Sequence, residues 1–382
     1  MAKIAWFLFG IMVANLPSCT SRADVERPTS MVEAETLSTI NSKTSNEWKC
    51  SVELLPENTD IEFAKFFSQN IGFSLSSDGH LYRFSGCRDC LKSFDINIPS
   101  NGYVSGHYFE SMNTGWITVY RDRIDSPTDF GSLLFITQDG GKTWSEQLRA
   151  TGAEFSSVRF LDKDDGWIVG RTSGDKNSLI TRPLLLHTLD GGRSWKNIPD
   201  KSKLEGAVGF DGIIPIGPGE AILLTSAKQF YQITESATFA ELVTTLEERE
   251  QTYIAQMGRL DNGNMWVVGG ADGREGVWGL LATYDGTRWQ KFSIPNVYLK
   301  SAVFVSNKEV LVSGYERLVN SAGVKLENRR SLLLFSHDSG KSFEPICDQK
   351  KLPDFRSLDL VSGNTVIAAR GRVIVTLKRL SR

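Results

Sequence analysis

The hydrophobic positions of this chain recur as short apolar runs that end in tight glycine turns. At residues 184–195, Leu-Leu-Leu-His-Thr is followed by Leu-Asp-Gly-Gly-Arg-Ser-Trp. An apolar run, an Asp-Gly turn and a second strand that begins at Ser-Trp predict a β-hairpin. Residues 133–144 repeat this pattern 51 positions earlier. Self-similarity at such a period indicates a repeat architecture.

The repeat unit has four strands, which residues 156–197 display best. Strands are predicted at 156–161, 166–170 and 184–188, and a fourth begins at Trp195. The hairpin position recurs at intervals of 46–53 residues and therefore counts the units. It falls at Ser85, Thr137, Thr188, Thr234, Thr283 and Ser336.

The two ends of the repeat region complete one more unit. Residues 355–360, 365–369 and 372–376 predict three strands without a fourth, whereas residues 47–54 supply one spare strand. Six full units and one split unit predict an all-β fold, a seven-bladed β-propeller of four-stranded antiparallel blades closed by the N-terminal strand. This closure hides the open sheet edges at the chain ends.

The first residues have the features of an export signal. Lys3 precedes an apolar run at 5–16, which is too short to span a bilayer. Leu16-Pro17-Ser18-Cys19 resembles the bacterial lipoprotein box, which implies lipidation of Cys19. We therefore expect a signal peptide at 1–18, a flexible polar tether at 19–46 and the propeller at 47–382. These features predict an exported protein that is anchored to a bacterial membrane and faces the periplasm. The outer membrane is favoured because Thr20 comes after the cysteine.

Composition and charge exclude several classes. Of 382 residues, 40% are hydrophobic and 23% are charged, which is typical of a folded soluble domain. The net charge of −2 provides no general attraction to nucleic acid. We predict a monomer that binds no nucleic acid and contacts the membrane only through its lipid.

Export makes the four remaining cysteines informative, because an oxidising compartment permits disulfides. Cys87 and Cys90 replace the Asp-Gly turn of the first unit. A disulfide stapling that turn is favoured over a redox pair or half a zinc site, since no second such motif or nearby histidine is present. Cys50 and Cys347 would lie on the outer strands of adjacent blades, and whether they pair is left open.

The hairpin motif resembles the Asp box of bacterial-neuraminidase repeats. We predict a structural role, because the Asp side chain accepts N–H groups of its own turn, Gly permits positive φ and the aromatic ring packs between hairpins. Calcium binding is the alternative, but single carboxylates are too few for it, so no metal or cofactor is predicted. The Asp-box residues are Thr137, Asp139, Gly141, Thr143, Trp144, Thr188, Asp190, Gly192, Ser194, Trp195, Asp285, Trp289, Ser336, Asp338, Gly340, Ser342 and Phe343.

An Asp box preceded by Asp-Gly-Trp-Ile-Val-Gly, as at residues 165–170, is a more specific combination. It is similar to the photosystem II stability and assembly factor family, and more distantly to sortilin- and sialidase-type propellers. The strong similarity covers residues 102–199. The resemblance implies a propeller without enzymatic activity that binds other proteins during assembly of a membrane complex.

Long charged loops between the second and third strands of blades two, three, five and six are the predicted binding face. They lie opposite the Asp-box turns, and we expect a protein partner there. The candidate contact residues are Arg121, Arg123, Asp125, Arg171, Arg274, Arg317, Arg329 and Arg330.

Two other functions remain open. A periplasmic inhibitor or immunity protein would use the same face. A sialidase-like glycoside hydrolase would need an arginine cluster and cooperating carboxylate and tyrosine groups. Tyr315-Glu316 is the nearest such pair, but adjacent strand residues face opposite ways. No catalytic residue is therefore assigned, and the protein is expected not to be an enzyme.

Overall fold

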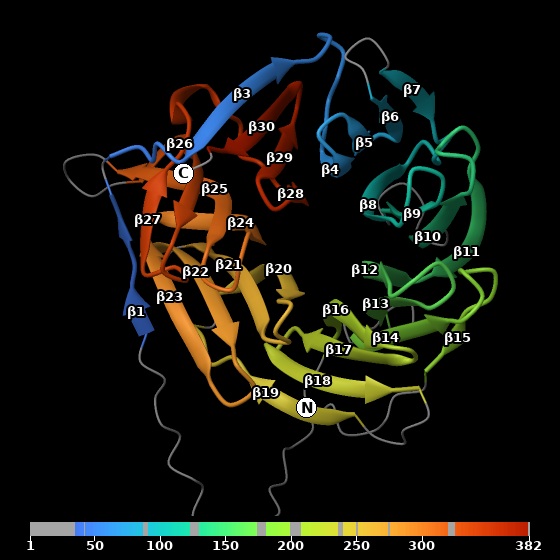
Figure 1. Ribbon diagram of the computed structural model, residues 1–382. Coiled ribbons are helices and arrows are strands. Elements are labelled where there is room, and N and C mark those ends of the chain that lie inside the picture. The colour runs from blue at the N-terminus through green and yellow to red at the C-terminus, as the bar shows by residue number, and fades with distance from the viewer. Residues whose placement is uncertain are drawn as a thin grey trace, which may run out of the picture. The chain divides into compact units, whose positions relative to one another are not determined.

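The structure is a computed structural model that describes residues 35–41, 43–86, 91–122, 130–173, 181–198, 208–235, 240–249, 251–273, 276–319 and 325–380. These residues belong to one compact unit. Its described residues make seven β-sheets, which stand like blades around a central axis (Figure 1). Within each blade we letter the strands a to d from the innermost outward.

The strands of each blade follow one another along the chain. Blade one contains β4 (Phe63–Ser68), β5 (Ile71–Leu75), β6 (His80–Ser85) and β7 (Lys92–Asp95). Blade two contains β8 (Gly102–Phe109), β9 (Gly115–Arg121), β10 (Gly131–Thr137) and β11 (Ser145–Thr151). Blade three contains β12 (Ala153–Phe160), β13 (Gly166–Ser173), β14 (Thr181–Thr188) and β15 (Lys196–Asn197). Blade four contains β16 (Phe210–Gly217), β17 (Glu220–Thr225), β18 (Gln229–Thr234) and β19 (Glu241–Thr245).

The last three blades continue this order. Blade five contains β20 (Tyr253–Arg259), β21 (Met265–Gly273), β22 (Gly276–Tyr284) and β23 (Trp289–Pro295). Blade six contains β24 (Val297–Phe304), β25 (Val310–Val319), β26 (Lys325–Ser336) and β27 (Ser342–Pro345), and a 3₁₀ turn (Gln349–Lys351) follows. Blade seven contains β28 (Leu358–Ser362), β29 (Thr365–Arg370), β30 (Val373–Arg379) and the N-terminal strand β3 (Trp48–Leu54).

The predicted seven-bladed propeller is confirmed. The third strands of blades one, two, three, four and six end at the hairpin positions counted in the sequence, and that of blade five ends one residue later at Tyr284. β3 pairs antiparallel with β30 over seven residue pairs, from Trp48–Arg379 to Leu54–Val373. The N-terminal strand therefore closes the ring by completing the last blade (Figure 1).

The core lies between adjacent blades, because both faces of each sheet are apolar. Trp116 on strand b of blade two is fully buried, and its ring stacks on Phe160 of blade three with centroids 3.8 Å apart. Its indole N–H also donates to the carbonyl of Gly191 in the next Asp box (3.3 Å). The tryptophan of the Gly-Trp motif thus joins neighbouring blades, which explains why the two motifs occur together.

A disulfide joins Cys50 of β3 to Cys347 just after β27, with Cα atoms 5.7 Å apart. These residues belong to blades seven and six, so the pairing that the sequence left open links the closing strand to its neighbouring blade. Cys87 and Cys90 lie outside the described residues.

The N-terminal segment also revises the predicted tether. β1 (Glu35–Leu37) pairs in parallel with β23, and β2 (Thr39–Ile40) pairs in parallel with β27. Blades five and six therefore have five strands, and residues 35–41 lie on the propeller instead of forming part of a flexible tether. The outer edge of a sheet offers unpaired N–H and C=O groups to any backbone, so a polar composition did not prevent pairing.

Candidate functional site

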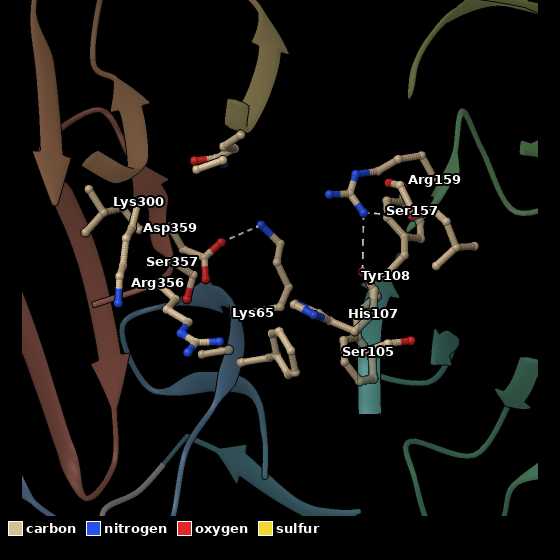
Figure 2. Close-up of a pocket in the computed structure, with 18 of the residues that line it drawn as sticks. Lys65, Ser105, His107, Tyr108, Ser157, Arg159, Lys300, Arg356, Ser357 and Asp359 are labelled. Atoms are coloured by element: carbon tan, nitrogen blue, oxygen red, sulfur yellow. Dashed lines mark hydrogen bonds and ion pairs between the residues drawn. The ribbon is translucent and has the colours of Figure 1, made fainter. Parts of the chain in front are cut away.

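The innermost strands of the blades enclose a central channel. A cavity of about 430 Å³ is lined from β4, β8, β12, β20, β24 and β28 and the residues just before β28. Figure 2 shows Arg159 on one wall, Lys300, Arg356 and Asp359 on the opposite wall, and Lys65 between them. Because each strand comes from a different blade, no sequence window contains this site.

The channel opens into a second cavity of about 480 Å³, and the two share Phe63, Ser105, Ser156 and Arg356. Ser77, in the tight b–c turn of blade one, lines this second cavity. The opening therefore lies on the b–c face, opposite the Asp-box turns. We call this opening the mouth and the b–c face the mouth face.

Tyrosines stand at the mouth. Tyr103 and Tyr120 are paired across β8 and β9 with ring centroids 5.8 Å apart, and Tyr103 is 48% exposed. Partial burial, and next the charge of Glu154, raise the pKa of both phenols. Tyr253, which begins the innermost strand of blade five and is 69% exposed, lines neither cavity and lies outside this opening. Exposed tyrosines on a rigid scaffold are typical of protein-binding surfaces.

Carboxylate–guanidinium pairs flank these tyrosines. Glu62 accepts from both Arg356 and Arg370 where blades seven and one meet. On blade three, Glu154 lies 2.7 Å from Arg171. The mouth thus presents charges that are largely paired within the propeller.

Deeper in the channel the charge becomes positive. Lys65 Nζ lies 2.9 Å from Asp359 Oδ1, and the other carboxylate oxygen accepts the Phe66 N–H (2.9 Å). Burial raises the pKa of Asp359, although Lys65 opposes that shift. Burial, together with the charges of Arg159 and Lys65, lowers the pKa of His107 to about 3. His107 is therefore neutral at physiological pH.

Four predicted contact arginines are described on or near the mouth face with partners. Arg171 pairs with Glu154, and Arg330 pairs with Glu316. Arg317 and Arg329 both approach Asp272, with nitrogen–oxygen distances of 2.7 and 3.4 Å. All four lie on strands and not on the predicted loops, because β13 extends to residue 173, β25 extends to residue 319 and β26 begins at residue 325.

The structure corrects the prediction for Arg121, which ends strand β9 and is only 3% exposed. A buried side chain has no accessible surface to offer a partner, so this residue is not a contact candidate. Arg123, Asp125 and Arg274 lie outside the described residues.

The pair considered for glycoside hydrolysis does not act as a unit. The Tyr315 hydroxyl donates to Asp272 (2.9 Å), whereas Glu316 pairs with Arg330. Burial and the hydrogen bond to Asp272 raise the pKa of Tyr315 to about 12, which disfavours the phenolate. The two adjacent side chains thus have different partners, as alternation along a strand predicts.

The Asp boxes stabilise their own turns. Asp190 Oδ1 accepts the Ser194 N–H (2.9 Å) and the Thr188 hydroxyl (2.8 Å), and Oδ2 accepts the Ser194 hydroxyl (2.6 Å). These bonds, led by those from Ser194, lower the pKa of Asp190 to about 2. Gly192 has φ +86°, a conformation in which a side chain is strained, and a Cβ there would lie 3.2 Å from the indole nitrogen of Trp116.

The other boxes repeat this geometry with local changes. Asp139 and Asp338 accept the equivalent N–H groups of Thr143 and Ser342, each at 2.9 Å. In the shortened turn of blade five, Asp285 accepts the N–H groups of Thr287 and Arg288. Within the described ranges, no group of three or more His, Cys, Asp or Glu side chains is arranged to hold a metal ion.

Comparison with known proteins points to one family. The model of the family described as "Photosynthesis system II assembly factor YCF48" matches residues 129–264. The resemblance to photosystem II assembly factors is confirmed. Photosystem II stability/assembly factor HCF136 of Arabidopsis thaliana is 34% identical over 83 residues, and that of Oryza sativa subsp. japonica is 31% identical over 126 residues. The aligned segments cover 20% and 28% of this chain and only 18% and 28% of those relatives.

Solved structures extend the similarity of fold to the whole ring. "YCF48 bound to D1 peptide" has a TM-score of 0.58 at 17% identity and covers 91% of this chain and 100% of its own. The GH74 xyloglucanase from Xanthomonas campestris has a TM-score of 0.61 at 13% identity, with 87% of this chain and 54% of its own covered. At such identities these likenesses concern the fold alone. Among the described residues, no helix has the length and apolarity needed to span a bilayer.

Sequence reasoning missed the channel, although the channel opens on the face for which a partner was predicted. The channel cations sit on innermost strands whose neighbours are apolar or small, so each looks like an ordinary strand residue. One signal was present. Strand a of three blades contains a charged residue where the repeat otherwise predicts a packing residue: Lys65, Arg159 and Lys300.

Proposed function

We propose that this protein is a propeller without enzymatic activity that binds a polypeptide segment of a partner at the mouth. The assembly or stability of a membrane or envelope complex is the process it serves. The observation that carries the proposal is a channel whose opening on one face is lined by the exposed Tyr103 and the half-buried Tyr120, while the turns of the opposite face are occupied by their own hydrogen bonds. Similarity to assembly factors supports it.

The place of action is also a proposal. The apolar run at 5–16 and the Cys19 motif support export and lipid anchoring on the periplasmic side of a bacterial membrane, with the outer membrane favoured. Mass spectrometry of the purified chain tests this. We expect a lipid modification on Cys19 of the parent protein and no such modification in Cys19→Ser. A Cys19→Ser protein that still fractionates with membranes would contradict the lipid anchor.

Affinity capture from detergent-solubilised envelope tests the binding function. Tyr103→Ala and Tyr120→Ala, which both change the lining of the opening, should each reduce recovery of the partner about tenfold, because truncation of an interface tyrosine commonly costs about 1–2 kcal/mol. Leu189→Ala is the matched control, since Leu189 is 59% exposed on the Asp-box face. Equal loss in all three variants, or in none, would contradict binding at the mouth.

The identity of the captured protein separates an assembly factor from an inhibitor or immunity protein. Capture of subunits of a membrane complex supports assembly, whereas capture of a secreted toxin supports inhibition. Hydrolysis of a fluorogenic sialoside by the purified chain would contradict the proposal that the protein is not an enzyme.

A further inference from the structure

The channel contains one cation whose charge the described residues leave unbalanced. The cations that line it are Lys65, Arg159, Lys300 and Arg356. Three of them have a carboxylate partner: Lys65 with Asp359, Lys300 with Asp354 and Arg356 with Glu62. Arg159 instead donates to two backbone carbonyls, those of Val158 (2.7 Å) and His107 (3.4 Å).

The position of Arg159 leaves its guanidinium within reach of an incoming group. Its side chain is exposed to the channel, although the protein around the channel reduces its hydration, which lowers its pKa. A guanidinium in such a site still has donors to offer an anion, and a charge-assisted pair is stronger there than in bulk water. Neighbouring His107 stays neutral, and the nearby charge of Lys65 is of the same sign. The site therefore favours a negatively charged group.

We propose that Arg159 binds a carboxylate, from an acidic side chain or a chain terminus, that a partner polypeptide inserts into the channel through the mouth. This rests on the proposed function and names the chemistry recognised there. A carboxylate matches the planar donors of a guanidinium, of which only one nitrogen is engaged by the protein. The joined cavities give an extended side chain a path from Tyr103 and Ser156 to Arg159.

Titration of the full chain in detergent with N-acetylglycine, followed by NMR or calorimetry, tests the site without a partner. We expect a Kd on the order of 1 mM and no binding of N-acetylglycinamide, which lacks the charge. Arg159→Gln should weaken binding by about tenfold or more, and Arg193→Gln, which changes an exposed guanidinium in the Asp-box turn of the same blade, should leave it unchanged. Unchanged binding by Arg159→Gln would overturn the proposal.

Thermal unfolding separates this role from a structural one. Loss of a merely structural arginine lowers the melting temperature, whereas relief of an unbalanced charge leaves it unchanged or raises it. Arg159→Gln is therefore expected to melt no lower than the parent chain, and a clearly lower value would count against the proposal. Arg159→Lys should retain partial binding, because lysine keeps the positive charge but lacks the planar, paired N–H donors of a guanidinium.

Capture experiments identify the source of the carboxylate. Excess N-acetylglycine should reduce partner recovery by the parent chain. If it does not compete, the partner does not occupy this site, and the proposal that a polypeptide supplies the carboxylate is overturned in favour of a free anion. If no partner is captured at all while N-acetylglycine binding still depends on Arg159, the proposed function fails and the carboxylate site stands.

Discussion

Lys65 Nζ lies 2.9 Å from Asp359 Oδ1, and this ion pair joins the first blade to the last where the ring closes. Asp359 is nearly buried, whereas Lys65 remains partly exposed to the channel. The ring is closed by the backbone pairing of β3 with β30, and this ion pair adds a side-chain contact between the first and last blades.

Lys65→Met should destabilise the propeller by about 2 kcal/mol. The substitution leaves a buried carboxylate with only the Phe66 N–H as partner, and we discount the usual cost because Lys65 is partly solvated. Urea unfolding measures the effect. Arg149→Gln, which removes an exposed pair with Glu146, should change stability by less than about 0.5 kcal/mol. Asp359→Asn combined with Lys65→Met should recover part of the loss.

Stability should decrease as the pH falls below about 6.5, partly through His107. The pKa of His107 is depressed in the folded state, so the unfolded chain binds a proton near pH 6.5 while the folded chain does not until about pH 3. The contribution of the neutral imidazole is therefore present above pH 6.5 and is lost as pH falls, by about 2 kcal/mol between pH 6.5 and 5. His107→Gln should flatten the dependence of the unfolding free energy on pH, and an unchanged slope would contradict the assignment.

Asp190→Ala should destabilise the protein by about 1–2 kcal/mol, because the Ser194 N–H and two hydroxyls lose their acceptor. Arg193→Ala in the same turn is the control, since among the described residues its exposed side chain donates one hydrogen bond, to the Asp190 carbonyl. Thermal unfolding with calcium or with chelator should give the same midpoint, because both carboxylate oxygens are already engaged. A calcium-dependent midpoint would revive the metal alternative.

Cys347→Ser should lower the free energy of unfolding by about 2–5 kcal/mol. The disulfide closes a loop of 297 residues and holds the closing strand against blade six. A parent chain treated with reductant should behave like the variant, and Ser51→Ala, an exposed neighbour on β3, should not. Non-reducing peptide mapping must recover Cys50 linked to Cys347; a different pairing would refute the assignment.

The sequence by itself determined the architecture. Each Asp-box hairpin encodes its own turn through local contacts such as Asp190 with Ser194, and the spacing of Thr137, Thr188 and Ser336 counts the blades. Local interactions between residues a few positions apart leave a repeated pattern, so the blade number, the closing strand and the face opposite the Asp boxes could be predicted.

Only the tertiary structure decided what that face contains. Arg159, Lys65 and Asp359 come from three blades, and their proximity depends on ring closure rather than on any local pattern. The burial of Arg121, the pairing of Arg317 with Asp272 and the strands at 35–40 were equally hidden, because each depends on a neighbour distant in sequence. The charged channel forms because packing between blades brings together residues that are far apart in the sequence, and such contacts leave no local sequence pattern.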